Sequence, residues 1–562
     1  RLSNIGSNGY IDRASTRLNS YFLQGGYFND NTVVKFITFN GTEKTYHAWD
    51  YASKADMKKY GRRYNPSGKY TDAAGNTAFY DNQTDNYHQQ SYQLIWNQLW
   101  GPHLNLNATL HYTKGQGYYD EYKANESTKK YGLLRTDAAT GTLMGYTSDL
   151  TRQKKLDNDF YGMVAGITYD GIKGLTAILG GGWNKYVGDH FGEVNWVKLS
   201  PNNLQPNQEY YRNRAKKTDG NIYGKLNWNF FQGLSAYVDL QYRHVNYTMQ
   251  DPTDKWGHNL DGRYIIDDDF DFFNPKFGLN YHIDTHQRLY ASYAIAHKEP
   301  TRNDYEDHIG TQLKAERLND FEMGYKWEGQ QFTAGINLYH MNYKDQFVLT
   351  GQLNEIGEPI ARNSGRSYRM GVELEATWKP LHWLRWDANA TLSHNRNKNW
   401  QQQLTNGKIT NLGNTHIAYS PDAIANSILT LNYKGLKASL QSQYVGKQYL
   451  TNTDFQQMSC KDQQGNTTQE TLMLADHLTT NMDFSYRLPL QIVGLKEAVV
   501  GLTLYNIFNV KFDNNGSADP QIKQEADGRI TAINERGVRD SKAAGFAPSA
   551  PLNWMMHLSL SF

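Results

Sequence analysis

The sequence has one cysteine, Cys460, which excludes an internal disulfide and a metal site built from several cysteines. It also lacks any apolar run of about 18 residues, the length that a transmembrane helix requires. The 58 basic and 56 acidic residues nearly cancel and are mixed along the chain, so no basic surface for nucleic acid is indicated. A helical membrane protein is therefore excluded, and nucleic acid is not expected as a partner.

Aromatic residues and glycines are abundant. The chain has 41 Tyr and 13 Trp, whose rings have an apolar body and a polar atom, as suits a membrane–water interface. Gly outnumbers Pro, 48 to 14, as expected for a protein of strands and turns. A transmembrane β-barrel fits this composition, because only alternate strand residues face lipid and the loops are polar.

The stretch 222–243 shows the pattern most clearly. Apolar residues alternate with polar ones on both sides of a break at Gln232-Gly233, which predicts a β-hairpin. Each arm has about ten alternating residues, enough for a tilted strand to cross a bilayer. One such hairpin leaves unpaired edges in lipid, so only a closed ring of strands could span the membrane.

The hairpin pattern repeats along the whole chain. Residues 1–4 are expected to be the tail of one more strand, which gives about twenty strands in total. The predicted arms are 17–28, 32–41, 89–100, 103–115, 157–169, 174–187, 219–231, 233–247, 271–283, 287–298, 315–328, 331–348, 366–379, 383–396, 422–434, 436–449, 477–488, 497–511 and 550–562.

Short turns alternate with long polar connections, as in outer-membrane barrels with periplasmic turns and external loops. A propeller or β-helix would have a fixed repeat length, and these loops vary too much for one. The last strand places Trp554, Leu558 and Phe562 on one face, with an aromatic residue at its end. This ending resembles the assembly signal of outer-membrane barrels.

Several stretches in order resemble the barrel of a TonB-dependent outer-membrane receptor. They are 10–14 with 21–22, the pair 289–305 (LYASYAIAHKEPTRNDY) and 313–327 (LKAERLNDFEMGYKW), 363–375 (NSGRSYRMGVELE), 504–516 (LYNIFNVKFDNNG) and 546–562. The resemblance implies a 22-stranded barrel that contacts outer-membrane lipid, with a plug domain and a TonB-contacting segment before it. Residues 1–562 are accordingly predicted to be the barrel domain, without the plug and the first strands.

The implied function is TonB-coupled uptake of a scarce metal chelate, a ferric siderophore first, with haem or cobalamin next. The alternatives are a glycan-import receptor of the same family, which would work beside a surface lipoprotein, and a passive porin-like barrel. No catalytic motif such as Gly-x-Ser-x-Gly or His-Glu-x-x-His is present, so neither an enzyme nor a protein-bound cofactor is predicted.

Ligand-binding candidates come from aromatic and basic clusters in the predicted long loops, because flat anionic chelates are held by stacking and by cations. Girdle or loop packing is the alternative interpretation of each cluster. The candidates are Tyr60, Arg62, Arg63 and Tyr64; Tyr118, Tyr119 and Tyr122; and Tyr210, Tyr211 and Arg212.

His308 is a further candidate, because its loop resembles the one that carries a haem-ligating His in the family's haem receptors. Here 296–300 (AHKEP) and 312–316 (QLKAE) depart from the haem-receptor motifs, which favours an exposed loop His. The run Asp267–Asp269 is expected to be solvated, and no metal site is predicted.

Overall fold

The computed structural model describes residues 1–202, 205, 207–250, 264–308, 312–354, 357–462, 464–490, 494–538, 540 and 542–562, and of residues 264 and 265 it describes the backbone. Most of the predicted loop 248–270 lies outside these residues. The chain divides into two compact units. The first unit contains residues 1–50, 64–228 and 238–275, and the second contains 51–63, 229–237 and 276–562.

The fold is all-β, and 21 strands belong to one large sheet whose recorded pairs are antiparallel. The described helices are α1 (Lys54–Tyr60), α2 (Arg302–Asp307) and the short 3₁₀ helix η1 (Thr128–Tyr131). None of the helices in the described part of the chain could cross a membrane.

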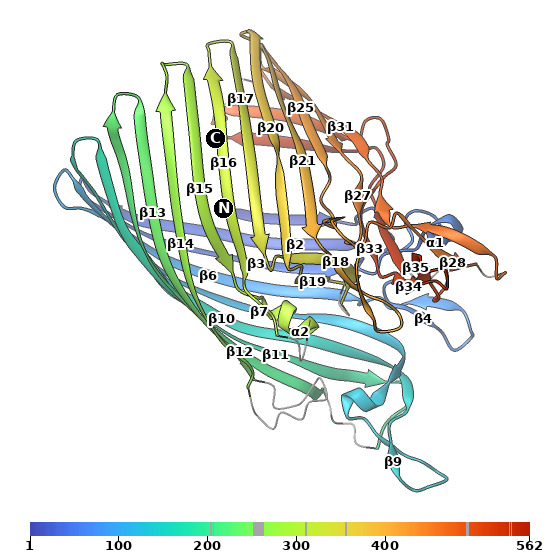
Figure 1. Cartoon of the computed structure of the whole chain (residues 1–562). Coiled ribbons are helices and arrows are strands. Elements are labelled where there is room, and N and C mark those ends of the chain that lie inside the picture. Colours follow the sequence, from blue (N-terminus) through green and yellow to red (C-terminus); the bar gives the residue numbers. More distant parts are fainter. Residues whose placement is uncertain are drawn as a thin grey trace. The chain divides into compact units, whose positions relative to one another are not determined.

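The first unit contains the longest strands, and β6, β7, β10, β11 and β12 run beside one another in it (Figure 1). Adjacent strands pair in sequence order, through short turns at one end. Its sheet strands are β1 (Leu2–Ser7), β2 (Ser15–Phe28), β3 (Thr32–Tyr46), β6 (Thr84–Leu99), β7 (Leu104–Ser127), β10 (Thr147–Ile172), β11 (Leu175–Val197), and most of β12 (Gln208–Phe231), β13 (Leu234–Gln250) and the start of β14 (Tyr264–His282).

The second unit continues the pattern, with β15, β16, β17, β20 and β21 side by side (Figure 1). Its sheet strands after β14 are β15 (Gln287–Lys298), β16 (Glu316–Glu328), β17 (Phe332–Lys344), β20 (Arg366–Leu381), β21 (Leu384–Lys398), β24 (Thr415–His416), β25 (Ala423–Tyr433), β26 (Leu436–Val445), β31 (His477–Arg487), β32 (Glu497–Tyr505) and β37 (Asn553–Ser561).

The long connections fold into small sheets of their own. In the first unit these are β4 (Lys69–Thr71) with β5 (Thr77–Phe79), and β8 (Arg135–Thr136) with β9 (Leu143–Met144). The second unit has β18 (Phe347–Leu353) with β19 (Pro359–Asn363), β22 (Gln401–Gln403) with β23 (Ile409–Asn411), β27 (Gln448–Tyr449) with β30 (Met473–Leu474), β33 (Asp513–Ala518) with β36 (Ala544–Pro548), and the four-stranded set β28 (Gln457–Lys461), β29 (Thr467–Thr471), β34 (Gln521–Gln524) and β35 (Ile530–Asn534).

The alternation predicted for 222–243 is confirmed. Ile222, Leu226 and Trp228 are 57%, 49% and 54% exposed, whereas the polar residues between them are mostly half-buried. Apolar side chains that remain exposed on one face of a long strand are what lipid contact requires. The turn at Gly233 needs glycine, because its φ is +77°.

Each predicted arm coincides with a strand, but several boundaries were wrong. Strands β7, β10, β11 and β12 continue through much of the predicted loops 116–156 and 188–218, because polar cross-strand pairs extend the ladders. The predicted arm 331–348 ends at Lys344, where Asp345 takes φ +55°. The arm 497–511 ends at Tyr505, because Asn506 has φ +52°. Asp267–Asp269 lie in β14 rather than in a loop.

Candidate functional site

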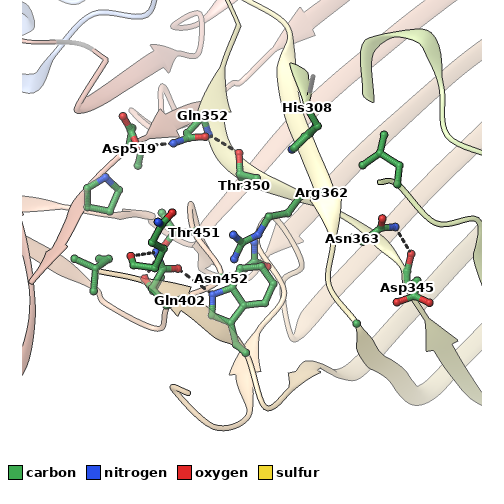
Figure 2. Close-up of a pocket in the computed structure, with 18 of the residues that line it drawn as sticks. His308, Asp345, Thr350, Gln352, Arg362, Asn363, Gln402, Thr451, Asn452 and Asp519 are labelled. Atoms are coloured by element: carbon green, nitrogen blue, oxygen red, sulfur yellow. Dashed lines mark hydrogen bonds between the residues drawn. The ribbon is translucent and has the colours of Figure 1, made fainter. Parts of the chain in front are cut away.

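A polar cavity of about 660 Å³ lies in the second unit, among the connections at the ends of its strands (Figure 2). Its walls come from the end of α2, from β18 and β19, and from segments after β21, β27 and β33. The residues used below are His308, Lys314, Gln352, Arg362, Trp400, Gln402, Asn452 and Asp519, all of which line it.

The wall formed by β18 and β19 is held by a small apolar cluster. Val348, Trp400 and Ile417 are buried together, and Leu412 packs against them. Val348 pairs with Arg362 across the two strands, so the hairpin brings Arg362 beside the cluster. The pairing of β18 with β19 therefore fixes the position of the Arg362 backbone beside the cluster.

Arg362 lies across the face of Trp400, with the guanidinium carbon 4.1 Å from the ring centroid. Its Nη2 donates a hydrogen bond to the Gln401 carbonyl oxygen at 3.2 Å. Burial lowers the pKa of Arg362, although arginine remains charged at any physiological pH. Among the described residues no carboxylate forms an ion pair with it, so the cavity contains a cation available to an anionic ligand.

Asn452 is held in the cavity wall by three hydrogen bonds. Its Oδ1 accepts hydrogen bonds from Asn397 Nδ2 and from the Ala418 backbone nitrogen, both at 3.0 Å, and its Nδ2 donates to the Leu349 carbonyl oxygen at 2.7 Å. These bonds join three separate connections. The cavity is therefore largely preformed, which lowers the entropic cost of binding.

Gln352 and Asp519 form another part of the cavity wall. Gln352 Nε2 donates a hydrogen bond to Asp519 Oδ1 at 2.6 Å, as Figure 2 shows. Arg536 Nη2 lies 3.0 Å from the other carboxylate oxygen of Asp519. The negative charge of Asp519 is thus compensated within the protein. Gln402 Oε1 accepts a bond from Trp400 Nε1 at 3.1 Å, which holds the indole ring in place.

His308 is the one sequence-predicted candidate that lines this cavity. It ends α2, a helix that begins with a capping box between Thr301 and Asp304. The His308 Nδ1 lies 2.9 Å from the Asp304 carbonyl oxygen, so this nitrogen donates the hydrogen bond. Next to it, burial raises the pKa of Asp307 to about 6.

The cluster at 60–64 does not line the cavity and is divided between the two units, with Tyr64 in the first. Arg62 donates to the Phe512 carbonyl oxygen at 2.8 Å and lies 3.6 Å from Asp513. Tyr60 ends α1 and is exposed, and Arg63 is also exposed. The contacts of Arg62 tie α1 to the segment before β33.

Tyr118, Tyr119 and Tyr122 lie in the first unit, in the extended part of β7 rather than in a loop. Tyr119 packs edge-on against Trp49, with ring centroids 5.2 Å apart. Tyr122 donates to Asp149 at 2.9 Å and packs on Tyr70. Tyr118 is 37% exposed. Tyr119 and Tyr122 thus make packing contacts that hold the connections of this unit.

Tyr210, Tyr211 and Arg212 lie in β12, also in the first unit. Tyr210 packs against Tyr131 and Tyr211, the latter buried. Arg212 binds Glu209 through two hydrogen bonds, of 2.9 and 2.8 Å. It also lies 3.4 Å from Asp189, so its charge is compensated by neighbouring carboxylates.

The sequence analysis missed Arg362, Trp400, Gln352, Gln402 and Asn452. None of them belongs to an aromatic or basic cluster in the sequence, and three connections far apart along the chain bring them together. Arg362 immediately precedes the motif 363–375, which was the nearest available signal. The described residues contain no group of three or more His, Cys, Asp or Glu side chains that could hold a metal ion.

The family model described as "TonB dependent receptor-like, beta-barrel" matches residues 15–510. No curated protein sequence matches.

Solved structures do match the fold. The ferric citrate transporter FecA, unliganded, has a TM-score of 0.70 at 12% identity, with 100% of this chain and 73% of that chain covered. The ferric-catecholate import receptor Fiu from K12 E. coli, in its closed form, has a TM-score of 0.65 at 11% identity, with 99% of this chain and 76% of that chain covered. The copper transporter OprC has a TM-score of 0.65 at 11% identity, with 97% of this chain and 72% of that chain covered.

Proposed function

This chain belongs to the family of TonB-dependent receptor-like β-barrels, and on that premise we propose that it serves TonB-coupled uptake of a metal chelate across the outer membrane. Barrels of this family lie in the outer membrane of Gram-negative bacteria, and the family consists of transport receptors rather than enzymes. A ferric siderophore is the chelate class we favour, ahead of haem and cobalamin.

The observation that carries this proposal is the position of Arg362 on Trp400 in the preformed cavity. Ferric citrate and the catecholate type of ferric siderophore are anionic, with planar donor groups. A guanidinium held flat on an indole ring presents its other face and its N–H donors to such a group. Lys314 and His308 line the same cavity, and the ammonium group of Lys314 adds further donors.

We assign residues 1–562 to the barrel domain of this receptor. Energy coupling would require a plug domain and a TonB-contacting segment outside these residues. Support comes from the coverage of the solved structures: each is matched over 97–100% of this chain, but over 72–76% of its own.

One observation favours a second candidate, a glycan-import receptor of the same family. Much of the cavity wall consists of neutral amides and hydroxyls, among them Gln402, Gln403, Thr350 and Thr451. Such groups match the hydroxyls of a sugar, whose rings also pack on aromatic side chains. A receptor of this kind would work beside a surface lipoprotein.

The test is tryptophan-fluorescence quenching of the purified full-length receptor against ferric siderophores, haem, cobalamin and oligosaccharides. For a chelate, Arg362→Gln should weaken binding by about ten- to a hundredfold, the value of one or two charge-assisted hydrogen bonds. The matched control is Arg529→Gln, because Arg529 is an exposed loop arginine that pairs with Asp527 away from the cavity.

Each outcome decides between the candidates. Saturable quenching by one chelate that Arg362→Gln weakens supports chelate uptake. Binding of an oligosaccharide alone supports glycan import. Chelate binding that Arg62→Gln abolishes and Arg362→Gln leaves intact would place the site at the cluster 60–64 and contradict the cavity assignment.

A further inference from the structure

Four cationic residues form a row across four neighbouring strands of the second unit. Arg317 in β16 pairs with Lys344 in β17, Lys344 pairs with Arg366 in β20, and Arg366 pairs with Lys398 in β21. Directly paired residues of antiparallel strands project to the same face of the sheet. With strands about 4.8 Å apart, the row spans about 14 Å. We call these four residues the cation row.

The cation row lies on the apolar, exposed face of the sheet. All four residues are exposed, as are Leu338, Met370 and Leu392 further along the same side of β17, β20 and β21. Ser367 and Asn397, each next to a member of the row and on the opposite face, are fully buried. The row therefore faces the membrane side of the barrel, away from the cavity.

Its height along the strands places it at the outer edge of the apolar band. Lys344 is twelve residues from Phe332, which lies beside the short turn before β17. Arg366 is likewise twelve residues from Trp378. Twelve residues extend about 40 Å along a strand, or close to 28 Å of height at the usual tilt. The apolar band of such barrels is about 25 Å tall, so the cation row lies at the level of the external head groups.

In the part of the chain that the structure describes, the four charges lack acidic partners. Among the described residues, none of the four forms an ion pair; Arg317 bonds to the amide of Asn319 at 3.3 Å, and Lys398 lies over the ring of Tyr368 at 5.0 Å. Like charges placed directly opposite each other in a sheet are destabilising. In the first unit, by contrast, Lys114 of β7 forms ion pairs with Asp157 and Asp159.

We propose that the cation row binds the phosphate groups of a phosphorylated lipid in the external leaflet. Anionic phosphates would relieve the repulsion between the four cations, and the acyl chains would lie on the apolar residues below. The next paired row toward the membrane supplies neutral hydrogen-bonding groups on three strands, because Asn319 pairs with Asn342 and Asn342 with Tyr368. On β21 that row ends at Arg396, whose charge is paired with Asp422 at 3.3 Å. This interaction is independent of the transported ligand.

The test uses purified full-length receptor and fluorescent lipopolysaccharide as the phosphorylated lipid. A variant carrying Arg317→Gln, Lys344→Gln, Arg366→Gln and Lys398→Gln should bind at least about tenfold more weakly, the loss expected for a few charge-assisted contacts. Wild-type receptor should bind dephosphorylated lipopolysaccharide as weakly as the variant binds the intact lipid. Lys114→Gln is the matched control and should change neither affinity, because Lys114 is neutralised by its own carboxylates.

Heat-modifiable gel mobility verifies that the variant has folded. Unchanged affinity in the folded variant would overturn the proposal, as would equal binding of the dephosphorylated lipid by the wild type. Displacement of the lipid by inorganic phosphate at moderate ionic strength would show that the row takes free phosphate, which would also contradict a lipid site. Chelate or glycan binding should be the same in the variant, so this test and that of the transport function can fail separately.

Discussion

Arg362 and Trp400 lie on different connections of the second unit, and the guanidinium carbon of the first is 4.1 Å from the ring centroid of the second. Trp400 is 4% exposed, and the hydrogen bond from its Nε1 to Gln402 fixes the ring. The buried indole thus positions the cation that we propose to contact the ligand.

This pair makes a double-mutant cycle informative. Trp400→Ala should weaken chelate binding although the ring is covered by the arginine, because Arg362 loses the surface that orients it. The coupling between Trp400→Ala and Arg362→Gln should be about 1–2 kcal/mol, the range for a partly desolvated cation–π contact. Trp400→Phe should recover part of the affinity. Additive losses in the fluorescence titration would contradict a positioning role for Trp400.

Substitutions on the two faces of β12 should differ sharply. Leu226 is 49% exposed on the apolar face, and Leu226→Arg should destabilise the assembled barrel by about 2–4 kcal/mol near the bilayer midplane. The neighbouring Asn227→Arg, on the opposite face, should be tolerated. Urea unfolding in lipid vesicles measures the free energy of unfolding of both variants. Equal destabilisation would show that the assignment of Leu226 to the lipid-facing side and Asn227 to the opposite side is wrong.

A buried ion pair holds the extended strands of the first unit. Arg152 Nε donates to Glu121 at 2.8 Å and Arg152 Nη1 to the Tyr131 hydroxyl at 3.0 Å, with both charged side chains almost fully buried. Arg152→Ala should cost up to about 3–5 kcal/mol of local stability, because the buried Glu121 carboxylate then keeps only Lys123 as a cationic partner, at 2.9 Å.

Hydrogen exchange of the amides in β7 and β10 measures the effect of Arg152→Ala. The control is the double change Arg152→Met with Glu121→Leu, which removes both charges and should cost much less. A large loss in the double variant as well would attribute the effect to packing rather than to the unpaired charge.

His47 should make the stability of the first unit's connections depend on pH. It is 5% exposed and stacks on Trp49, with ring centroids 3.3 Å apart. Burial lowers the pKa of His47 from 6.5 to about 4. Because the unfolded chain binds the proton more readily, the stabilisation is complete above about pH 6.5 and is lost as the pH falls toward 4.

The loss of local stability at low pH is expected to reach about 3 kcal/mol, since one unit of pKa difference between the folded and unfolded states corresponds to about 1.36 kcal/mol. Hydrogen exchange of residues 47–50, which belong to the first unit, should show this loss between pH 4 and 7 after correction for the intrinsic exchange rate. His47→Gln should remove this slope without removing the other acid-sensitive steps. An unchanged slope in the variant would mean that His47 is not the titrating group.

The sequence by itself determined the strands, their order and the face that each presents. Alternation of period two is a local property of the sequence, because successive side chains of a strand point to opposite faces. Residues such as Ile222 and Leu226 are therefore assigned to the apolar face from their own segment, without information from the rest of the chain. The alternation of short and long connections likewise distinguishes the two ends of the strands.

The tertiary structure alone decided the cavity, the contacts of the candidate clusters and the cation row. Tyr122 and Arg212 are chemically suitable for a ligand, but Asp149 and Glu209 occupy their polar groups. Arg362 meets Trp400 because two connections fold against each other, and Arg317 meets Lys344 through strand register. Such pairings depend on contacts between residues far apart in sequence, and composition and periodicity carry no information about them.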